Sequence, residues 1–240
     1  MTTDKIVIRD LEVLVVRKAI KNLHLAVYPP DGQVRVAVPL HIDDEQVRLA
    51  VISRLGWIRK QRADFATQPR QSTREMVSGE SHYLFGTRYR LEVIWRRGRH
   101  EVIIENRTTL RLLVNPGTTR AKRTLVLNEW YRGILKEAIP DLLAHWQPII
   151  GVEVSGWGIQ KMKTKWGSCN IEPRRILLNL ELAKKPVECL EYIVVHELVH
   201  LHERHHNERF RTLMNKYMPQ WRLYRDILKS EPLGHNDWRY

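Results

Sequence analysis

The chain has 240 residues, of which 43% are hydrophobic and 28% are charged, and its formal net charge is +13. This composition is typical of a globular protein and excludes a disordered tail, a fibrous repeat and a membrane bundle. A basic surface attracts polyanions, so association with a nucleic acid or a nucleotide is one expectation. The first residues alternate as in a strand, without an apolar secretory core, and two cysteines build no disulfide framework. We therefore expect a cytoplasmic protein with no membrane partner.

The residues up to about 115 have the patterns of β-strands with one helix among them. We predict a strand over residues 5–17 and a hairpin whose turn is Pro-Pro-Asp-Gly at residues 29–32. Asp43 or Asp44 then caps a helix whose apolar residues recur at helical spacing. Three more strands are expected near residues 82–95, 101–105 and 109–114.

The pattern becomes helical from about residue 119, and Pro140 is expected to end or kink that first helix. The shift near residue 115 divides the chain into a β-rich N-terminal part, residues 1–115, and a mixed core over residues 116–240. The fold class that these patterns predict is α+β.

The most informative stretch is the segment 196–200, with the sequence His-Glu-Leu-Val-His. On a helix, His196 and His200 lie one turn apart on the same face, so both imidazoles can bind one metal ion. Glu197 lies beside that face and can take a proton from a water that the metal activates. The spacing predicts a metal site with two histidine ligands and a carboxylate base.

A hydrolytic zinc centre usually has three protein ligands and keeps one position open for water. The candidates for the third ligand are His202, His205 and His206. His202 falls on the opposite side of the helix from His196, and a straight helix would carry His206 roughly 15 Å along the axis. Ligation by His205 or His206 therefore requires the helix to end soon after its second histidine. Asn207 is suited to cap a new helix there, and spacing alone leaves His205 and His206 nearly equal.

Several short segments, taken in order, resemble one known family. They are Lys-Thr-Lys-Trp-Gly-Ser-Cys at residues 163–169, Leu-Asn-Leu at 178–180, His-Glu-Leu-Val-His-Leu at 196–201, His-Asn-Glu-Arg-Phe at 206–210 and Lys-Tyr-Met-Pro at 216–219. This order closely resembles the YgjP-like metallopeptidase family, and the N-terminal hairpins and helix also suit that family. A more distant similarity is to the SprT-like proteases, which share a Trp-Gly-Ser-Cys-like segment before a His-Glu-x-x-His helix.

The resemblance implies a zincin-like catalytic core over residues 116–240, with a small twisted sheet, an active-site helix that carries the His-Glu-x-x-His motif, and Zn2+ as the cofactor. It also implies that the third ligand comes from the start of the next helix, within an Asn-His-Ser-like segment. That segment falls on residues 205–207 and selects His206, although this chain has His205 and Asn207 where the family often has Asn and Ser.

The activity expected first is that of a zinc-dependent metallopeptidase that acts on a peptide or protein, with Glu197 activating water. The alternative is a metal-dependent UTP pyrophosphatase, an activity assigned to proteins similar to this family, and a lesser alternative is a nucleic-acid-associated zinc-binding module. A peptidase should have an open groove along an edge strand near residues 177–180, whereas a nucleotide hydrolase should have a closed pocket lined by Lys or Arg. Tyr217, Lys163 and Lys165 are candidates for stabilising the attacked oxygen.

Overall fold

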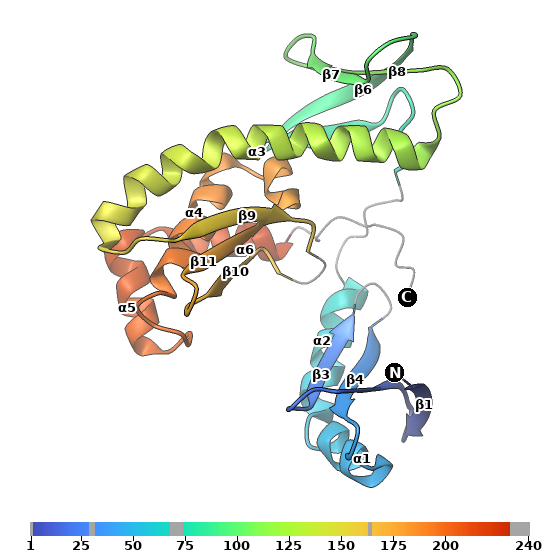
Figure 1. Ribbon diagram of the computed structural model, residues 1–240, viewed down its shortest axis with the longest axis vertical. Helices are drawn as coiled ribbons and strands as arrows, with labels where there is room; N and C mark the ends of the chain where they lie inside the picture. Colours follow the sequence, from blue (N-terminus) through green and yellow to red (C-terminus); the bar gives the residue numbers. More distant parts are fainter. Residues whose placement is uncertain (1, 29–31, 68–73, 163–164, 231–240) are drawn as a thin grey trace. The chain divides into compact units, whose positions relative to one another are not determined.

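The computed structural model describes residues 2–28, 32–67, 74–162 and 165–230. The chain divides into two compact units, Met1–Arg70 and Gln71–Tyr240 (Figure 1). Each unit has its own hydrophobic core. Strands dominate the earlier residues and helices the later ones, so the fold is α+β. No helix among the described residues is both long enough and apolar enough to span a bilayer.

The first unit is built on a β-sheet with helices that follow it in sequence. Its described elements are β1 (Thr2–Ile8), β2 (Leu11–Lys18), β3 (His24–Tyr28), β4 (Gln33–Pro39), α1 (Asp44–Ile52) and α2 (Leu55–Thr67). The strand order is β1-β2-β4-β3, in which β2 and β4 are parallel and the outer pairs are antiparallel. Alternate residues on the central strands, such as Val13 and Val36, are buried in one core with Val47 and Val51 of α1.

Local backbone chemistry explains how this unit matches and departs from the sequence-based expectation. The single strand predicted over residues 5–17 is a hairpin, because Arg9 adopts the left-handed conformation (φ 57°) and turns the chain between β1 and β2. Asp43 is confirmed as a helix cap: its carboxylate accepts a hydrogen bond from the Gln46 N–H at 2.8 Å, and Gln46 Oε1 accepts one from the Asp43 N–H at 3.2 Å. The helix is interrupted, however, so α1 and α2 replace the one helix expected.

The second unit contains two sheets and a long helix. Its described elements are β5 (Ser81–Leu84), β6 (Thr87–Trp95), β7 (Glu101–Ile104), β8 (Thr109–Val114), α3 (Arg120–Ile150), β9 (Gly156–Gln160), β10 (Gly167–Asn170), β11 (Arg175–Asn179), the 3-10 helix η1 (Leu180–Lys184), α4 (Val187–Val199), α5 (Glu208–Tyr217) and α6 (Trp221–Ser230). One sheet has the order β5-β6-β8-β7, and the other has the order β10-β11-β9. Within this unit α3 runs between the first sheet and the layer formed by α4 and the second sheet (Figure 1).

Helix α3 continues through Pro140 to Ile150, so the proline does not end it. A proline inside a helix removes one backbone hydrogen bond and usually destabilises the helix. Ile139 and Leu143, on either side of the proline in sequence, are buried in the core of the unit. Burial of this apolar face offsets the lost hydrogen bond and keeps the helix continuous.

The compact units divide the chain between residues 70 and 71, whereas the composition shift indicates a boundary near residue 115. The sheet of β5 to β8 accounts for the difference. Its buried residues Leu91, Leu110 and Leu112 belong to the same core as the buried residues of α3 and α4. A boundary at residue 115 would separate this sheet from the helix that covers it.

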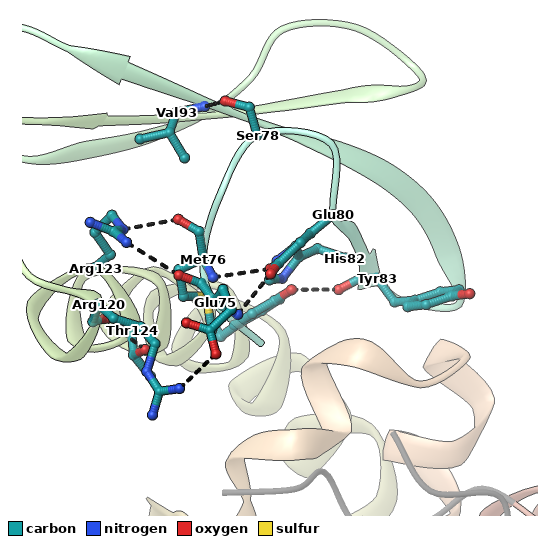
Figure 2. A network of polar contacts seen from close by, with 11 residues as sticks. Glu75, Met76, Ser78, Glu80, His82, Tyr83, Val93, Arg120, Arg123 and Thr124 are labelled. Carbon is teal, nitrogen blue, oxygen red and sulfur yellow. Dashed lines mark hydrogen bonds and ion pairs between the residues drawn. The ribbon is translucent and has the colours of Figure 1, made fainter. Parts of the chain in front are cut away.

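The segment that leads into β5 is fastened to α3 by a network of polar contacts (Figure 2). Arg123 of α3 donates hydrogen bonds to the backbone carbonyl oxygens of Met76 at 2.9 Å and Glu75 at 3.2 Å. Arg120 pairs with the Glu75 carboxylate at 3.0 Å. The Glu80 carboxylate in turn accepts hydrogen bonds from the backbone N–H groups of Glu75 and Met76, at 2.7 and 3.1 Å. This segment belongs to no strand or helix, so its backbone N–H and C=O groups form hydrogen bonds with charged side chains instead.

The buried His82 in this network predicts a specific pH dependence of stability. Its Nε2 lies 3.4 Å from Glu80 Oε2, and burial lowers the pKa of His82 from 6.5 to about 4. Below pH 6.5 the unfolded chain binds a proton that the folded chain does not bind until near pH 4, so acid weakens the fold. Between pH 7 and pH 5 the wild type should lose unfolding free energy faster than His82→Gln, by up to about 1.4 kcal/mol per pH unit. Denaturant unfolding curves of both proteins at the two pH values test this, and an identical pH dependence would contradict it.

Candidate metal centre

Helix α4 contains the His-Glu-x-x-His motif, and its apolar residues are packed into the core. Val194, Val195 and Leu198 have no exposed surface. This packing fixes the rotation of the helix about its axis. His196 and His200, which remain partly exposed, are therefore held toward the outside of the core, one helical turn apart.

The chain turns back directly after the motif. Helix α4 ends at Val199 with His200 as its C-cap residue, and α5 begins at Glu208. Asn207 is confirmed as the cap of α5, because its side-chain oxygen accepts a hydrogen bond from the Phe210 N–H at 3.0 Å. The break that a third histidine ligand from the following segment requires is thus present.

Three histidine side chains converge at this turn. Ring nitrogens of His196, His200 and His206 all lie within 4.8 Å of one another, and the Nε2 atoms of His196 and His206 are 3.0 Å apart. Two imidazole ligands of one tetrahedral zinc ion are separated by roughly 3.3 Å, given Zn–N bonds of 2.0–2.1 Å. The ring of Phe210 packs against all three imidazoles, with centroid distances between 4.7 and 4.9 Å. The spacing of the three donors therefore fits a metal ion.

The other two histidines considered as ligands lie elsewhere. Among the described residues, His205 is not part of the converging group, and its backbone N–H donates to Glu203 Oε1 at 3.1 Å. His202 Nε2 lies 2.8 Å from the backbone carbonyl oxygen of Ile150, the last residue of α3. His202 therefore contacts the C-terminal end of α3 and is not part of the converging group.

The three converging rings are in the protonation state that binds a metal. Burial lowers the pKa of His196 to about 3 and lowers the pKa values of His200 and His206 from 6.5, so all three rings are neutral at pH 7. His200 Nδ1 lies 3.1 Å from the backbone carbonyl oxygen of Glu203, which accepts a hydrogen bond from Nδ1–H and leaves Nε2 for a metal. His196 Nδ1 is buried and has no hydrogen-bond partner in the described part of the chain, so this ring contacts polar groups through Nε2.

The Glu197 carboxyl group lies against Gly167, the first residue of β10. Glu197 is 4% exposed, and burial raises its pKa to about 8, an effect that the Lys165 ammonium group opposes. A Cβ atom added to Gly167 would lie 2.9 Å from Glu197 Cδ and 2.8 Å from Ile193 Cγ2. Glycine at this position lets β10 approach α4 closely and leaves room for the carboxyl group.

A buried asparagine holds the segment that precedes β10. Asn179 has no exposed surface, and its Nδ2 donates hydrogen bonds to the backbone carbonyl oxygens of Lys165 at 2.6 Å and Met162 at 2.9 Å. Its Oδ1 accepts a hydrogen bond from the Glu181 N–H at 3.1 Å. The Leu-Asn-Leu segment therefore ties β11 to the chain that enters β10, and so supports the position of Gly167.

A cleft of about 760 Å³ opens at the converging histidines. Its walls also include β10, Tyr192 of α4 and four cationic side chains, which are Lys165, Arg204, Arg225 and Lys229. Of these residues, the sequence predicted Lys165 but not Tyr192. Tyr192 could have been predicted from its position four residues before His196, which places both on the same helical face. The two cations of α6 were not predicted either, because no local pattern indicates that this helix reaches the cleft.

Two expectations about the cleft are corrected by the structure. Residues 177–180 contain no edge strand: β11 is the central strand, paired in parallel with β9 on one side and antiparallel with β10 on the other. In the described part of the chain, the edge strand at the cleft is β10. Tyr217 does not line the cleft, since its hydroxyl donates to the carbonyl oxygen of Ile150 at 3.4 Å. Lys163 lies outside the described residues.

Comparison with known proteins identifies the family to which this arrangement belongs. A family model described as the YgjP-like metallopeptidase domain matches residues 21–231. The chain belongs to this family. The resemblance seen in the sequence is thereby confirmed, and at the level of the YgjP-like family the chain is a metal-dependent hydrolase, a metallopeptidase.

Two solved structures are similar to part of the chain. The metallopeptidase zymogen of Pyrococcus abyssi abylysin is 24% identical with a TM-score of 0.35, and the match covers 38% of this chain and 90% of that chain. The metallopeptidase zymogen of Methanocaldococcus jannaschii jannalysin is 24% identical with a TM-score of 0.33, over 38% of this chain and 95% of that chain. No match was found among curated proteins.

Replacement of His206 by alanine tests the third ligand. His206→Ala should weaken zinc binding by more than about 100-fold, because two histidines alone leave the ion short of a protein ligand. His205→Ala is the matched control, since it removes the adjacent imidazole outside the converging group, and it should retain one zinc ion per chain. Zinc content after dialysis, measured by atomic emission, compares the variants. Retention of zinc by His206→Ala together with its loss from His205→Ala would transfer the ligand role to His205.

Proposed function

We propose that the chain is a zinc-dependent peptidase in which Glu197 acts as the general base. The observation that carries this proposal is a buried carboxyl group beside three converging neutral imidazoles, on the wall of a cleft large enough for a peptide. Membership of the YgjP-like metallopeptidase family supports the same class of reaction.

In this proposal His196, His200 and His206 hold the zinc ion and leave one coordination position open. When bound, zinc would supply Lewis acidity that lowers the pKa of water and polarises the scissile carbonyl. The three rings come from a helix, its C-cap and the turn before the next helix, and Phe210 packs against all of them. The protein therefore arranges the ligands before the ion binds.

Burial alone favours the protonated form of Glu197 near pH 7, and the positive charge of a bound zinc ion would favour the carboxylate. That carboxylate accepts the proton of the attacking water and returns it to the leaving amine. The Glu197 backbone is part of the buried helix α4, and its carboxyl group is confined by Gly167 and Ile193. Confinement limits the orientations of the carboxylate, which favours proton transfer along one direction. Burial also keeps bulk water from exchanging the proton before the leaving group receives it.

The substrate backbone is expected to pair with β10. This strand hydrogen-bonds to β11 on one side, and its other edge has no strand partner among the described residues. Residues Gly167 to Asn170 line the cleft, so an extended peptide added at this edge would pass the three histidines. Such pairing recognises the peptide backbone and places little demand on its side chains.

The second candidate function is a metal-dependent nucleoside triphosphate pyrophosphatase that acts on UTP. The observation that favours it is the set of four cations on the cleft wall, which suits a triphosphate. In that reaction Glu197 and the three histidines would keep the roles assigned above. Pyrophosphate release from UTP by zinc-loaded protein therefore separates the two candidates.

Glu197→Gln is the direct test of the general base. The amide has nearly the shape of the carboxylate but cannot accept a proton, so peptide hydrolysis should fall by at least about 100-fold while zinc content is unchanged. Hydrolysis is measured on an unfolded protein substrate, with UTP assayed in parallel. Wild-type rates in the zinc-loaded variant would exclude Glu197 as the base. UTP hydrolysis without peptide hydrolysis would replace the peptidase by the second candidate.

Gly167→Ala tests whether the position of the carboxylate matters. The added methyl group would overlap the Glu197 carboxyl group and would lie 2.8 Å from Ile193 Cγ2, so the carboxyl group must leave its present position. We expect zinc binding to persist and the hydrolysis rate to fall by at least about tenfold. Gly156→Ala in β9 of the same sheet is the control, because no atom lies within 4 Å of its added Cβ. Equal rates in the two variants would show that the close approach at residue 167 has no catalytic role.

A further inference from the structure

Helix α6 places two cations on the wall of the cleft. Arg225 and Lys229 are four residues apart, so they lie one turn apart on one face of the helix, and both line the cleft together with Leu228. Leu228 is 4% exposed and belongs to the core of the unit. The helix is therefore anchored against the rest of the unit, with the backbone positions of both cations at the cleft.

The guanidinium of Arg225 is held by two contacts. It lies over the ring of Trp221 at 5.1 Å from the centroid, and its Nε donates to Asp226 Oδ1 at 2.9 Å. Trp221 is buried and stacks on Tyr192, whose ring meets that of His196 at a centroid distance of 5.7 Å. A continuous chain of ring contacts thus connects Arg225 to the converging histidines.

The acidic groups near this end of the cleft are few. Its lining carboxylates are Glu172 and Glu197, and Glu197 is 4% exposed and proposed to serve the reaction. Among the described residues no carboxylate lies within ion-pair distance of Lys229, but the Asp226 carboxylate, which accepts a hydrogen bond from Arg225 Nε, is near enough for both cations to lower its pKa. The terminal nitrogens of a guanidinium engaged through Nε can still donate two parallel hydrogen bonds to a carboxylate.

We propose that Arg225 and Lys229 form a carboxylate-binding subsite, so that the cleft prefers peptides with a carboxylate near the scissile bond. This inference rests on the proposed peptidase function and names its substrate class. The carboxylate comes either from an Asp or Glu side chain or from the C-terminus of the peptide. An Arg–carboxylate contact held in place on the protein side is strong enough to shift kcat/KM by about tenfold.

The test uses a set of fluorogenic peptides of one length and zinc-loaded full-length protein. The peptides carry Glu or Gln at each position in turn, with the C-terminus either free or amidated. The wild type should cleave a carboxylate peptide about tenfold faster than its amide counterpart, measured as kcat/KM. Preference for an internal Glu identifies a side-chain carboxylate as the ligand, and preference for a free end identifies the C-terminus. Equal rates across the set would overturn the proposal.

Variants of the two cations test whether the preference for carboxylate peptides comes from the proposed subsite. Arg225→Gln and Lys229→Gln should each reduce the carboxylate-to-amide ratio toward one. Arg222→Gln is the matched control, because Arg222 also lies over the Trp221 ring, at 4.7 Å, but does not line the cleft. It should keep the wild-type ratio. A ratio that survives in both Arg225→Gln and Lys229→Gln would also overturn the proposal.

A binding measurement distinguishes an error in the proposed subsite from an error in the proposed peptidase function. Fluorescence anisotropy of the same peptides with Glu197→Gln reports affinity without turnover. About tenfold tighter binding of the carboxylate peptide, with no cleavage by zinc-loaded wild type, would support the subsite and count against the peptidase. Equal binding of carboxylate and amide peptides would overturn the subsite whether or not peptides are cleaved.

Discussion

The site depends on one constraint, which is that α4 must end at its second histidine. Ten residues of straight helix would place His206 roughly 15 Å from His196, yet their Nε2 atoms are 3.0 Å apart. The chain after His200 is held in its reversed path at both ends. His202 binds the carbonyl oxygen of Ile150, and Asn207 caps α5. Neither residue touches the converging rings through a polar contact, but both fix the turn that brings the third ring into place.

The second requirement is a close approach between a strand and a helix. The carboxyl group of Glu197 occupies space that any side chain at residue 167 would fill, so β10 can serve as the wall only with glycine there. The Asn179 side chain stabilises the segment before β10 by donating hydrogen bonds to the backbone carbonyl oxygens of Lys165 and Met162. The motif that supplies the proposed base and the segment that leaves room for its carboxyl group are thus parts of one arrangement, although about 30 residues separate them in sequence.

Local signals allowed much of this to be predicted from the sequence. The helical spacing of His196 and His200, the cap at Asn207 and the cap at Asp43 all depend on neighbouring residues, and all are present. What could not be predicted depends on long-range pairing. The central position of β11 follows from its parallel partner β9, the sheet before residue 115 shares its core with α3, and α6 reaches the cleft by packing on α4. None of these contacts leaves a periodic pattern in the sequence.

Net charge and local charge have different consequences for a protein this basic. The formal charge of +13 is spread along the chain and attracts polyanions of every kind, but mobile ions screen that attraction beyond about 8 Å at physiological salt. Discrimination between substrates requires a cation whose position is fixed before the ligand arrives. Arg225 meets this condition because Trp221 and Asp226 restrain it and because Trp221 stacks on Tyr192 beside the histidines. The proposed carboxylate preference therefore depends on the contacts that hold the Arg225 guanidinium at the cleft, and not on the net charge of the chain.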